Sequence, residues 1–151
     1  MRKSLPLPAL ILVMPFSYAV EAEDPRQLVE LPEMMQTHML EHMRDHLSAL
    51  HEIMAYLSAD DPDAAADTAE QRLGVSSMQG GMQGGSMQGG GGGYMMGRHM
   101  PEGMRAIGQN VHRSASRFAL TAQERDLSAA YKALLPVTAS CVACHASYRV
   151  R

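Results

Sequence analysis

The chain has 151 residues, 46% of them hydrophobic, which suits one globular domain with one core. Its formal net charge is −3, from 13 Lys and Arg against 16 Asp and Glu, and no run of basic residues indicates contact with a phosphate backbone. These properties argue against nucleic acid as a partner.

Residues 1–22 are typical of an export signal. Arg2 and Lys3 precede a largely apolar run, and small-residue cleavage patterns end just before Val20 and Glu23. Prolines interrupt the run, which is shorter than the ~20 apolar residues of a membrane span, and we identify no later apolar run long enough. We therefore expect cleavage, a periplasmic location, and a mature domain over residues 23–151 without stable membrane insertion. An uncleaved membrane anchor is the alternative.

Helical spacing of apolar residues dominates the mature chain, and no convincing strand pattern occurs. A first helix is expected to begin at Pro32, whose fixed φ suits the first helical position, and to end near Ser58. A second helix is expected after Asp61 as N-cap, with Pro62 at its first position and Gly74 ending it. The connection between the two helices is therefore short.

Residues 75–97 form a glycine-rich segment in which a Met-Gln-Gly-Gly unit recurs. Ordering so much glycine costs conformational entropy, so we expect a flexible loop. Its methionines, with His99 and Met100 beyond it, are also candidate ligands for Cu(I), which favours soft thioethers. We favour repeat expansion in an unconstrained linker over copper binding, because a glycine-rich arm has no preorganised site.

Two further helices complete the chain. The third is expected from Pro101 to Leu120. A fourth is expected to open with a capping box, Thr121 as N-cap and Glu124 three residues later, and to continue towards Tyr148. Pro136 lies inside it and predicts a kink or a short break.

Four amphipathic helices with two short connections and one long loop predict an all-α fold, an antiparallel four-helix bundle. In an up-down-up-down arrangement the end of the fourth helix lies beside the beginning of the first. Residues 141–149 are therefore expected to face residues 35–43.

The sequence Cys141-Val-Ala-Cys144-His145 is the attachment pattern of a c-type haem. On a helix the two cysteines share one face and can each form a thioether to the haem, while His145 is held beneath the iron as an axial ligand. A disulfide, a thiol–disulfide exchange site and a zinc site are alternatives. We expect one covalent haem c, because the pair lies late in an all-α chain and no second Cys pair offers zinc further ligands.

An export signal, four helices and Cys-x-x-Cys-His close to the C-terminus resemble the cytochrome c′ family of bacterial periplasmic cytochromes. The resemblance implies a four-helix haem protein, often a homodimer through its first two helices, that transfers electrons or binds small gases such as nitric oxide. This chain departs from the family in its glycine-rich loop and in a first helix rich in Met and His. These departures leave the coordination state of the iron open.

Candidates for the distal side of the haem lie near the start of the first helix. By the bundle geometry and by position relative to the family, Met39, Met43 or His42 is expected there, with a five-coordinate iron as the alternative. Arg149 lies four residues after His145, and from there its side chain can reach a haem propionate. A cation near a helix C-terminus is also favoured by the helix dipole alone, so both interpretations of Arg149 stay open.

Three histidines recur every four residues on the first helix, at His38, His42 and His46. The helical wheel directs His42 and His46 towards the bundle and leaves His38 at the edge. Such spacing can bind a transition metal, although polar packing or exposure is the commoner role of histidine.

The function expected from the sequence is one-electron transfer through haem c in the periplasm, with protein redox partners. Binding of nitric oxide or carbon monoxide at an open iron position is one alternative, and copper handling through Met and His residues is another. No nucleophile–base pair or carboxylate dyad is evident, so we do not expect an enzyme.

Overall fold

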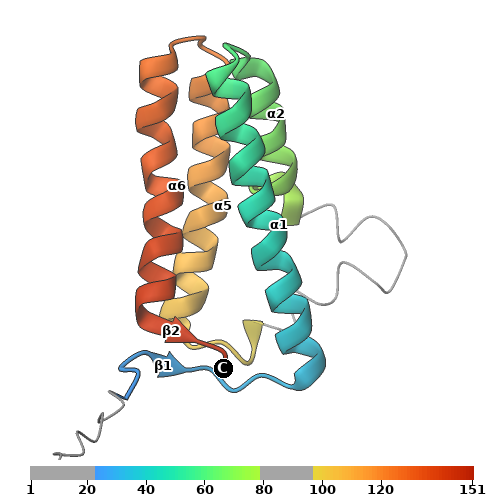
Figure 1. Cartoon of the computed structure of the whole chain (residues 1–151), viewed down its shortest axis with the longest axis vertical. Coiled ribbons are helices and arrows are strands. Elements are labelled where there is room, and N and C mark those ends of the chain that lie inside the picture. The colour runs from blue at the N-terminus through green and yellow to red at the C-terminus, as the bar shows by residue number, and fades with distance from the viewer. Residues whose placement is uncertain (1–22, 79–96) are drawn as a thin grey trace, which may run out of the picture.

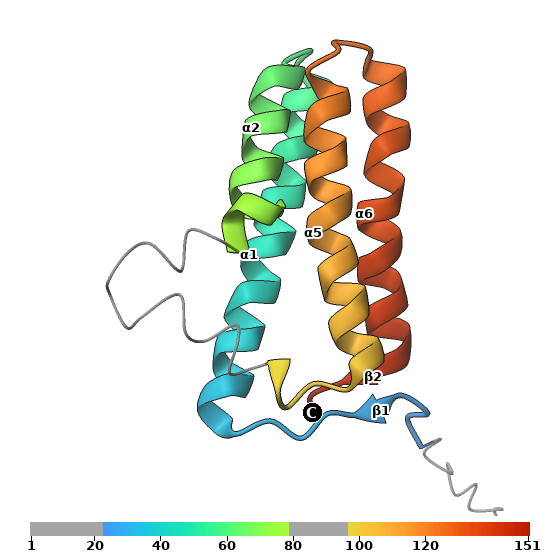
Figure 2. The ribbon, with the colours of Figure 1, turned by 180° about the vertical axis from the view of Figure 1, so that it is seen from behind.

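The computed structural model describes residues 23–78 and 97–151, and this part of the chain is mostly helical. Its long helices are α1 (Glu33–Ser58), α2 (Pro62–Arg72), α5 (Glu102–Ala122) and α6 (Leu127–Ser147). Figure 1 shows these helices side by side, and the view from behind in Figure 2 agrees, with α2 against both α1 and α5, and α5 against α6. The expected all-α class is confirmed.

The first three helix starts agree with the sequence signals. Pro32 and Pro101 are the residues immediately before α1 and α5, and Pro62 occupies the first turn of α2. The Asp61 side chain accepts a hydrogen bond from the Ala64 amide at 3.1 Å, as an N-cap does. Each of these boundaries is set by a proline or a capping side chain within the local sequence.

The expected start of the last helix is wrong. α5 continues through Thr121 to Ala122, where a buried alanine face keeps the chain helical, and α6 begins only at Leu127. Between the two helices, Arg125 adopts a left-handed backbone with φ 59°. Asp126 is the actual N-cap and accepts from the Ala129 amide at 3.0 Å.

α6 continues through Pro136 without the short break that the sequence allowed. Leu134 and Val137, on either side of the proline, are both buried, and their packing compensates for the lost backbone hydrogen bond. Ser140 also donates from its hydroxyl to the Pro136 carbonyl at 2.9 Å.

By length and composition alone, α6 is the one helix of the described residues that could cross a membrane, with a mean hydropathy of 1.4 over its most apolar window. The expectation that no later apolar run is long enough is therefore wrong on that criterion. A core helix of a water-soluble protein passes the same test, and α6 contributes Ala130, Leu134 and Val137 to the buried interior.

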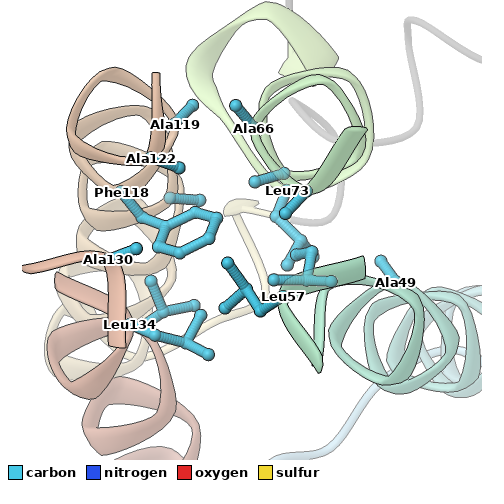
Figure 3. Packing of buried hydrophobic residues seen from close by; sticks show 14 of the residues in the cluster. Ala49, Leu57, Ala66, Leu73, Phe118, Ala119, Ala122, Ala130 and Leu134 are labelled. Atoms are coloured by element: carbon cyan, nitrogen blue, oxygen red, sulfur yellow. The ribbon is translucent and has the colours of Figure 1, made fainter. Parts of the chain in front are cut away.

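One large cluster of buried apolar residues, here called the main core, joins all four helices (Figure 3). Phe118, Ile53, Leu57 and Val137 are its largest fully buried side chains, and burying each contributes about 1.5–3 kcal/mol. Small residues between them let the helices approach closely. The main core comprises Ala49, Ile53, Leu57, Ala65, Ala66, Ala69, Leu73, Val111, Ala115, Phe118, Ala119, Ala122, Ala130, Leu134 and Val137.

A second, smaller cluster, here called the terminal cluster, is built on Val29, Met39 and Met104. It draws its residues from the segment before α1 and from the early turns of α1 and α5. Partly buried side chains pack against it from the segments before α1 and before α5 and from the C-terminal residues, namely Leu31, Met100, Cys144, Tyr148 and Val150. The terminal cluster therefore lies where the beginning and the end of the described residues meet.

Two short strands close this end of the molecule, which the sequence did not predict. β1 (Gln27–Leu28) pairs in parallel with β2 (Tyr148–Arg149), with Gln27 opposite Tyr148 and Leu28 opposite Arg149. Figure 1 shows this pair crossing beneath the helices. The last helix consequently ends at Ser147, and Tyr148 is extended.

Two sequence predictions fall wholly or partly outside the described residues. The export signal at 1–22 does so completely, and the flexible loop expected at 75–97 does so over residues 79–96. At its beginning the loop prediction is wrong, because residues 75–78 are helical. The Val75 amide donates to the Ser116 hydroxyl at 2.9 Å, which ties this turn to α5.

Candidate functional site

The two cysteines of the sequence motif lie on α6, where the main core and the terminal cluster meet. Cys141 packs against the main core and Cys144 against the terminal cluster. Both are free thiols and both are partly buried, whereas Val142 between them is 68% exposed. The helical spacing thus turns both sulfur atoms towards the interior side of α6.

The surroundings of the two thiols argue against a thiol–disulfide exchange site and a zinc site. Burial raises the pKa of both Cys141 and Cys144 above that of an ordinary thiol, and the neighbouring Cys141 adds to the shift at Cys144. A thiol–disulfide exchange site needs the opposite shift, because the thiolate is the nucleophile. In residues 23–78 and 97–151, no three His, Cys, Asp or Glu side chains gather as a metal site, which removes support for zinc.

His145 follows Cys144 on α6 and is exposed to solvent. Its backbone carbonyl accepts a hydrogen bond from Arg26 Nη1 at 3.3 Å, so the segment before β1 reaches across the end of α6. The imidazole is therefore accessible as a ligand, and it lies one helical turn after Cys141 on α6.

Only one of the three distal candidates lies beside the motif. Met39 is 5% exposed and belongs to the terminal cluster, against which Cys144 also packs. Met43 is 38% exposed. His42 is exposed and its ring contacts His38, one turn earlier on α1. Met39 and Cys144 thus share the terminal cluster, together with Val29 and Met104.

Arg149 lies in β2, beyond the end of α6, so it is not a cation of the last helical turn. Its Nε atom is buried and has no hydrogen-bond partner. The nearest acid is Asp24, whose Oδ2 lies 3.7 Å away and accepts a shorter bond of 2.6 Å from Arg26. A buried donor without an acceptor fits an anionic group at this place, and a haem propionate is such a group.

The N-terminal segment, which the sequence analysis did not connect with the site, holds the end of α6 in place. The Val29 amide donates to the Arg149 carbonyl at 2.8 Å, and the Gln36 side chain donates to the Val150 carbonyl. The hydrogen bonds of Asp24 with Arg26 lower the pKa of its carboxyl to about 2. The Asp-x-Arg spacing was the only local signal for this contact.

A row of four histidines runs along α1 and reaches α5. His38 and His42 lie edge to face with Nε2 atoms 3.0 Å apart, His46 continues the row, and His112 of α5 contacts His46 with ring centroids 6.0 Å apart. His38 and His46 are partly buried and His42 is exposed, which corrects the expected inward direction of His42. Desolvation lowers the pKa of His46 to about 4.

The site thus offers two neutral thiols on an inner helix face, an adjacent imidazole, a buried thioether and a buried guanidinium donor. Together these groups can hold an apolar, anionic, iron-bearing ring at one end of the molecule. Comparison of the chain with protein-family models, curated proteins and solved structures gave no match.

Proposed function

We propose that this chain is an exported, periplasmic c-type cytochrome, similar in plan to cytochrome c′, that binds one covalent haem and transfers single electrons between protein partners. The observation that carries the proposal is the Cys141-Val-Ala-Cys144-His145 motif, with both thiols free and packed against the interior. The packing of Cys144 against the cluster that contains Met39, and the buried donor of Arg149, support it.

The fold that we propose around this haem is an antiparallel four-helix bundle. Its support is the order of contacts, α1 with α2, α2 with α5, and α5 with α6. Helices that follow one another along the chain and pack side by side in a bundle are expected to run in opposite directions. The terminal cluster then forms the haem end of the bundle.

Each residue of the site has a distinct role in the proposal. Haem c, when bound, supplies the one-electron chemistry of its iron. The thiols of Cys141 and Cys144 would hold the ring to α6 as thioethers. His145 would ligate the iron, Arg149 would donate to a propionate, and the terminal cluster would exclude water from the ring.

Met39 is the residue that we propose on the distal side. A thioether ligand raises the reduction potential relative to an all-nitrogen pair and closes the iron to gases, which suits electron transfer. If Met39 only fills the pocket, the same apolar surroundings suit the binding of nitric oxide or carbon monoxide. Gas binding is therefore the second candidate function, and the burial of Met39 among apolar neighbours is the observation behind it.

An exposed apolar stripe on α1 supports association of two copies. Met43, Leu47 and Met54 follow one another at helical spacing with 38%, 68% and 44% of their surface exposed. We propose that this face contributes to a homodimer. Sedimentation equilibrium of the native protein and of Leu47→Glu tests this, with a dimer expected for the first and a monomer for the second.

The functional proposal is tested by producing the full chain with its export signal in a bacterium that attaches haem c. Absorption spectra of the reduced protein, recorded with and without carbon monoxide, report the coordination of the iron. A low-spin spectrum that ignores carbon monoxide supports electron transfer with Met39 as ligand. A high-spin spectrum that responds to carbon monoxide supports gas binding instead.

Two variants make the test specific. Met39→Leu keeps the volume of the side chain but removes the thioether, so a low-spin protein is expected to become high-spin and reactive with carbon monoxide. Met43→Leu, one turn further along α1, is the matched control and leaves the spectrum unchanged. A protein that acquires no haem absorbance at all contradicts both functions.

A further inference from the structure

We propose that His38 and His42 form a second site, separate from the haem, that binds one divalent transition metal ion with a preference for Ni²⁺ or Cu²⁺ geometry. The two residues are one turn apart on α1, so their side chains project from the same side of the helix. Their Nε2 atoms already lie 3.0 Å apart.

The separation of the two nitrogen atoms matches that of neighbouring ligands around a metal. Metal–imidazole bonds of about 2.0–2.1 Å that reach two atoms 3.0 Å apart enclose an angle of about 94° at the metal. Square-planar and octahedral ions need about 90° between neighbouring ligands, whereas tetrahedral Zn²⁺ needs about 109°. The pair is therefore preorganised for Ni²⁺ or Cu²⁺ rather than for Zn²⁺.

Without metal, two Nε2 atoms at this distance share one proton, because one ring must donate and the other accept. When a divalent ion binds, that proton moves through water to the Nδ1 atom of its own ring, and the ion accepts one Nε2 lone pair from each neutral ring. Desolvation and the neighbouring His38 lower the pKa of His42, which favours the neutral ring that a metal needs, although Asp45 and Glu41 act in the opposite direction. Water can fill the remaining coordination positions, because His42 is exposed.

The other two histidines of the row, His46 and His112, hold the ring of His42 in position. His46 lies edge to face with His42, with ring centroids 6.3 Å apart, and the low pKa of His46 leaves it neutral at neutral pH. His112 is oriented by its Nδ1 atom, 2.8 Å from the Leu73 carbonyl. A neutral ring beside His42 restricts its movement and adds no repulsive charge to the site.

Isothermal titration calorimetry of the untagged, haem-loaded full chain with Ni²⁺ and, separately, with Zn²⁺ tests this proposal. One Ni²⁺ per chain is expected, bound more tightly than Zn²⁺. His38→Gln and His42→Gln are each expected to weaken Ni²⁺ binding at least tenfold, and the double variant to lose this site. His51→Gln, an exposed histidine of the same helix outside the row, is the matched control and keeps the affinity of the native chain.

The haem spectrum and thermal unfolding of every variant are recorded alongside. Unchanged spectra with lost Ni²⁺ binding show that the site is independent of the haem. Native Ni²⁺ affinity in the double variant overturns the proposal, and so does an equal loss in His51→Gln. Zn²⁺ binding tighter than Ni²⁺ overturns the assigned geometry.

Discussion

Truncating Met39 to alanine tests whether the terminal cluster is a packed part of the fold. Met39 is 5% exposed, and large-to-small substitutions of buried methionine cost about 2–5 kcal/mol in unfolding free energy. The terminal cluster is small and several of its neighbours are partly exposed, so the cost should lie at the lower end, about 2 kcal/mol. With a urea dependence of about 2 kcal/mol per M, the unfolding midpoint falls by about 1 M.

The matched control is Met34→Ala on the same helix. Its side chain is 79% exposed, so the loss should stay within about 0.5 kcal/mol. Both proteins are unfolded in urea in the same haem-loaded state and followed by circular dichroism, which reports the helices directly. Equal midpoints for the two variants would refute the packing of Met39 in the terminal cluster.

Three further predictions concern stability, all measured as urea midpoints. Asp126→Ala should lower the free energy of unfolding by about 1 kcal/mol, because it removes the N-cap of α6, whereas Thr121→Ala should change it little. A larger loss for Thr121→Ala than for Asp126→Ala would instead support a helix that begins after Thr121, as the sequence predicted. A Cβ atom on Gly103 would lie 2.5 Å from the Tyr148 hydroxyl. The change in unfolding free energy caused by Gly103→Ala should therefore be about 1 kcal/mol more favourable in a Tyr148→Phe protein than in the native one. Equal changes in the two proteins would exclude the clash. His46 has a folded pKa of about 4 against an ordinary 6.5, so the unfolded chain binds more protons between these values and stability falls as pH drops from 6.5 to 4. His46→Gln should flatten that dependence, and an unchanged slope would contradict the assignment.

The helices were predictable where the chain carries local stop and start signals. Pro32, Asp61 and Pro101 fix three helix beginnings within a residue, because each acts on the backbone beside it. The capping-box pattern at Thr121 misled, since Ser or Thr followed by Glu three residues later also occurs inside helices. The pairing of Ala119 and Ala122 with the main core decided the boundary, and that packing is not visible locally.

Part of the candidate site was likewise predictable from local sequence, and part depends on long-range packing. The Cys141-Val-Ala-Cys144-His145 motif is local in sequence, and Met39, which was expected near it, belongs to the cluster against which Cys144 packs. The buried donor of Arg149 could not be foreseen, because it depends on β1 pairing with a segment about 120 residues away. His112 joins the histidine row for a similar reason, since only the packing of α5 brings it to His46.

Covalent attachment of haem is the claim on which the rest depends, and intact-protein mass spectrometry after denaturation measures it directly. The full chain, exported with a haem-attachment system present, should keep one haem through acid–acetone extraction and denaturing electrophoresis, because thioether bonds survive both. Replacing Cys141 and Cys144 with alanine should leave only the polypeptide mass. A native chain recovered without haem under these conditions, or a double variant that retains it, would contradict the proposal that this protein is a c-type cytochrome.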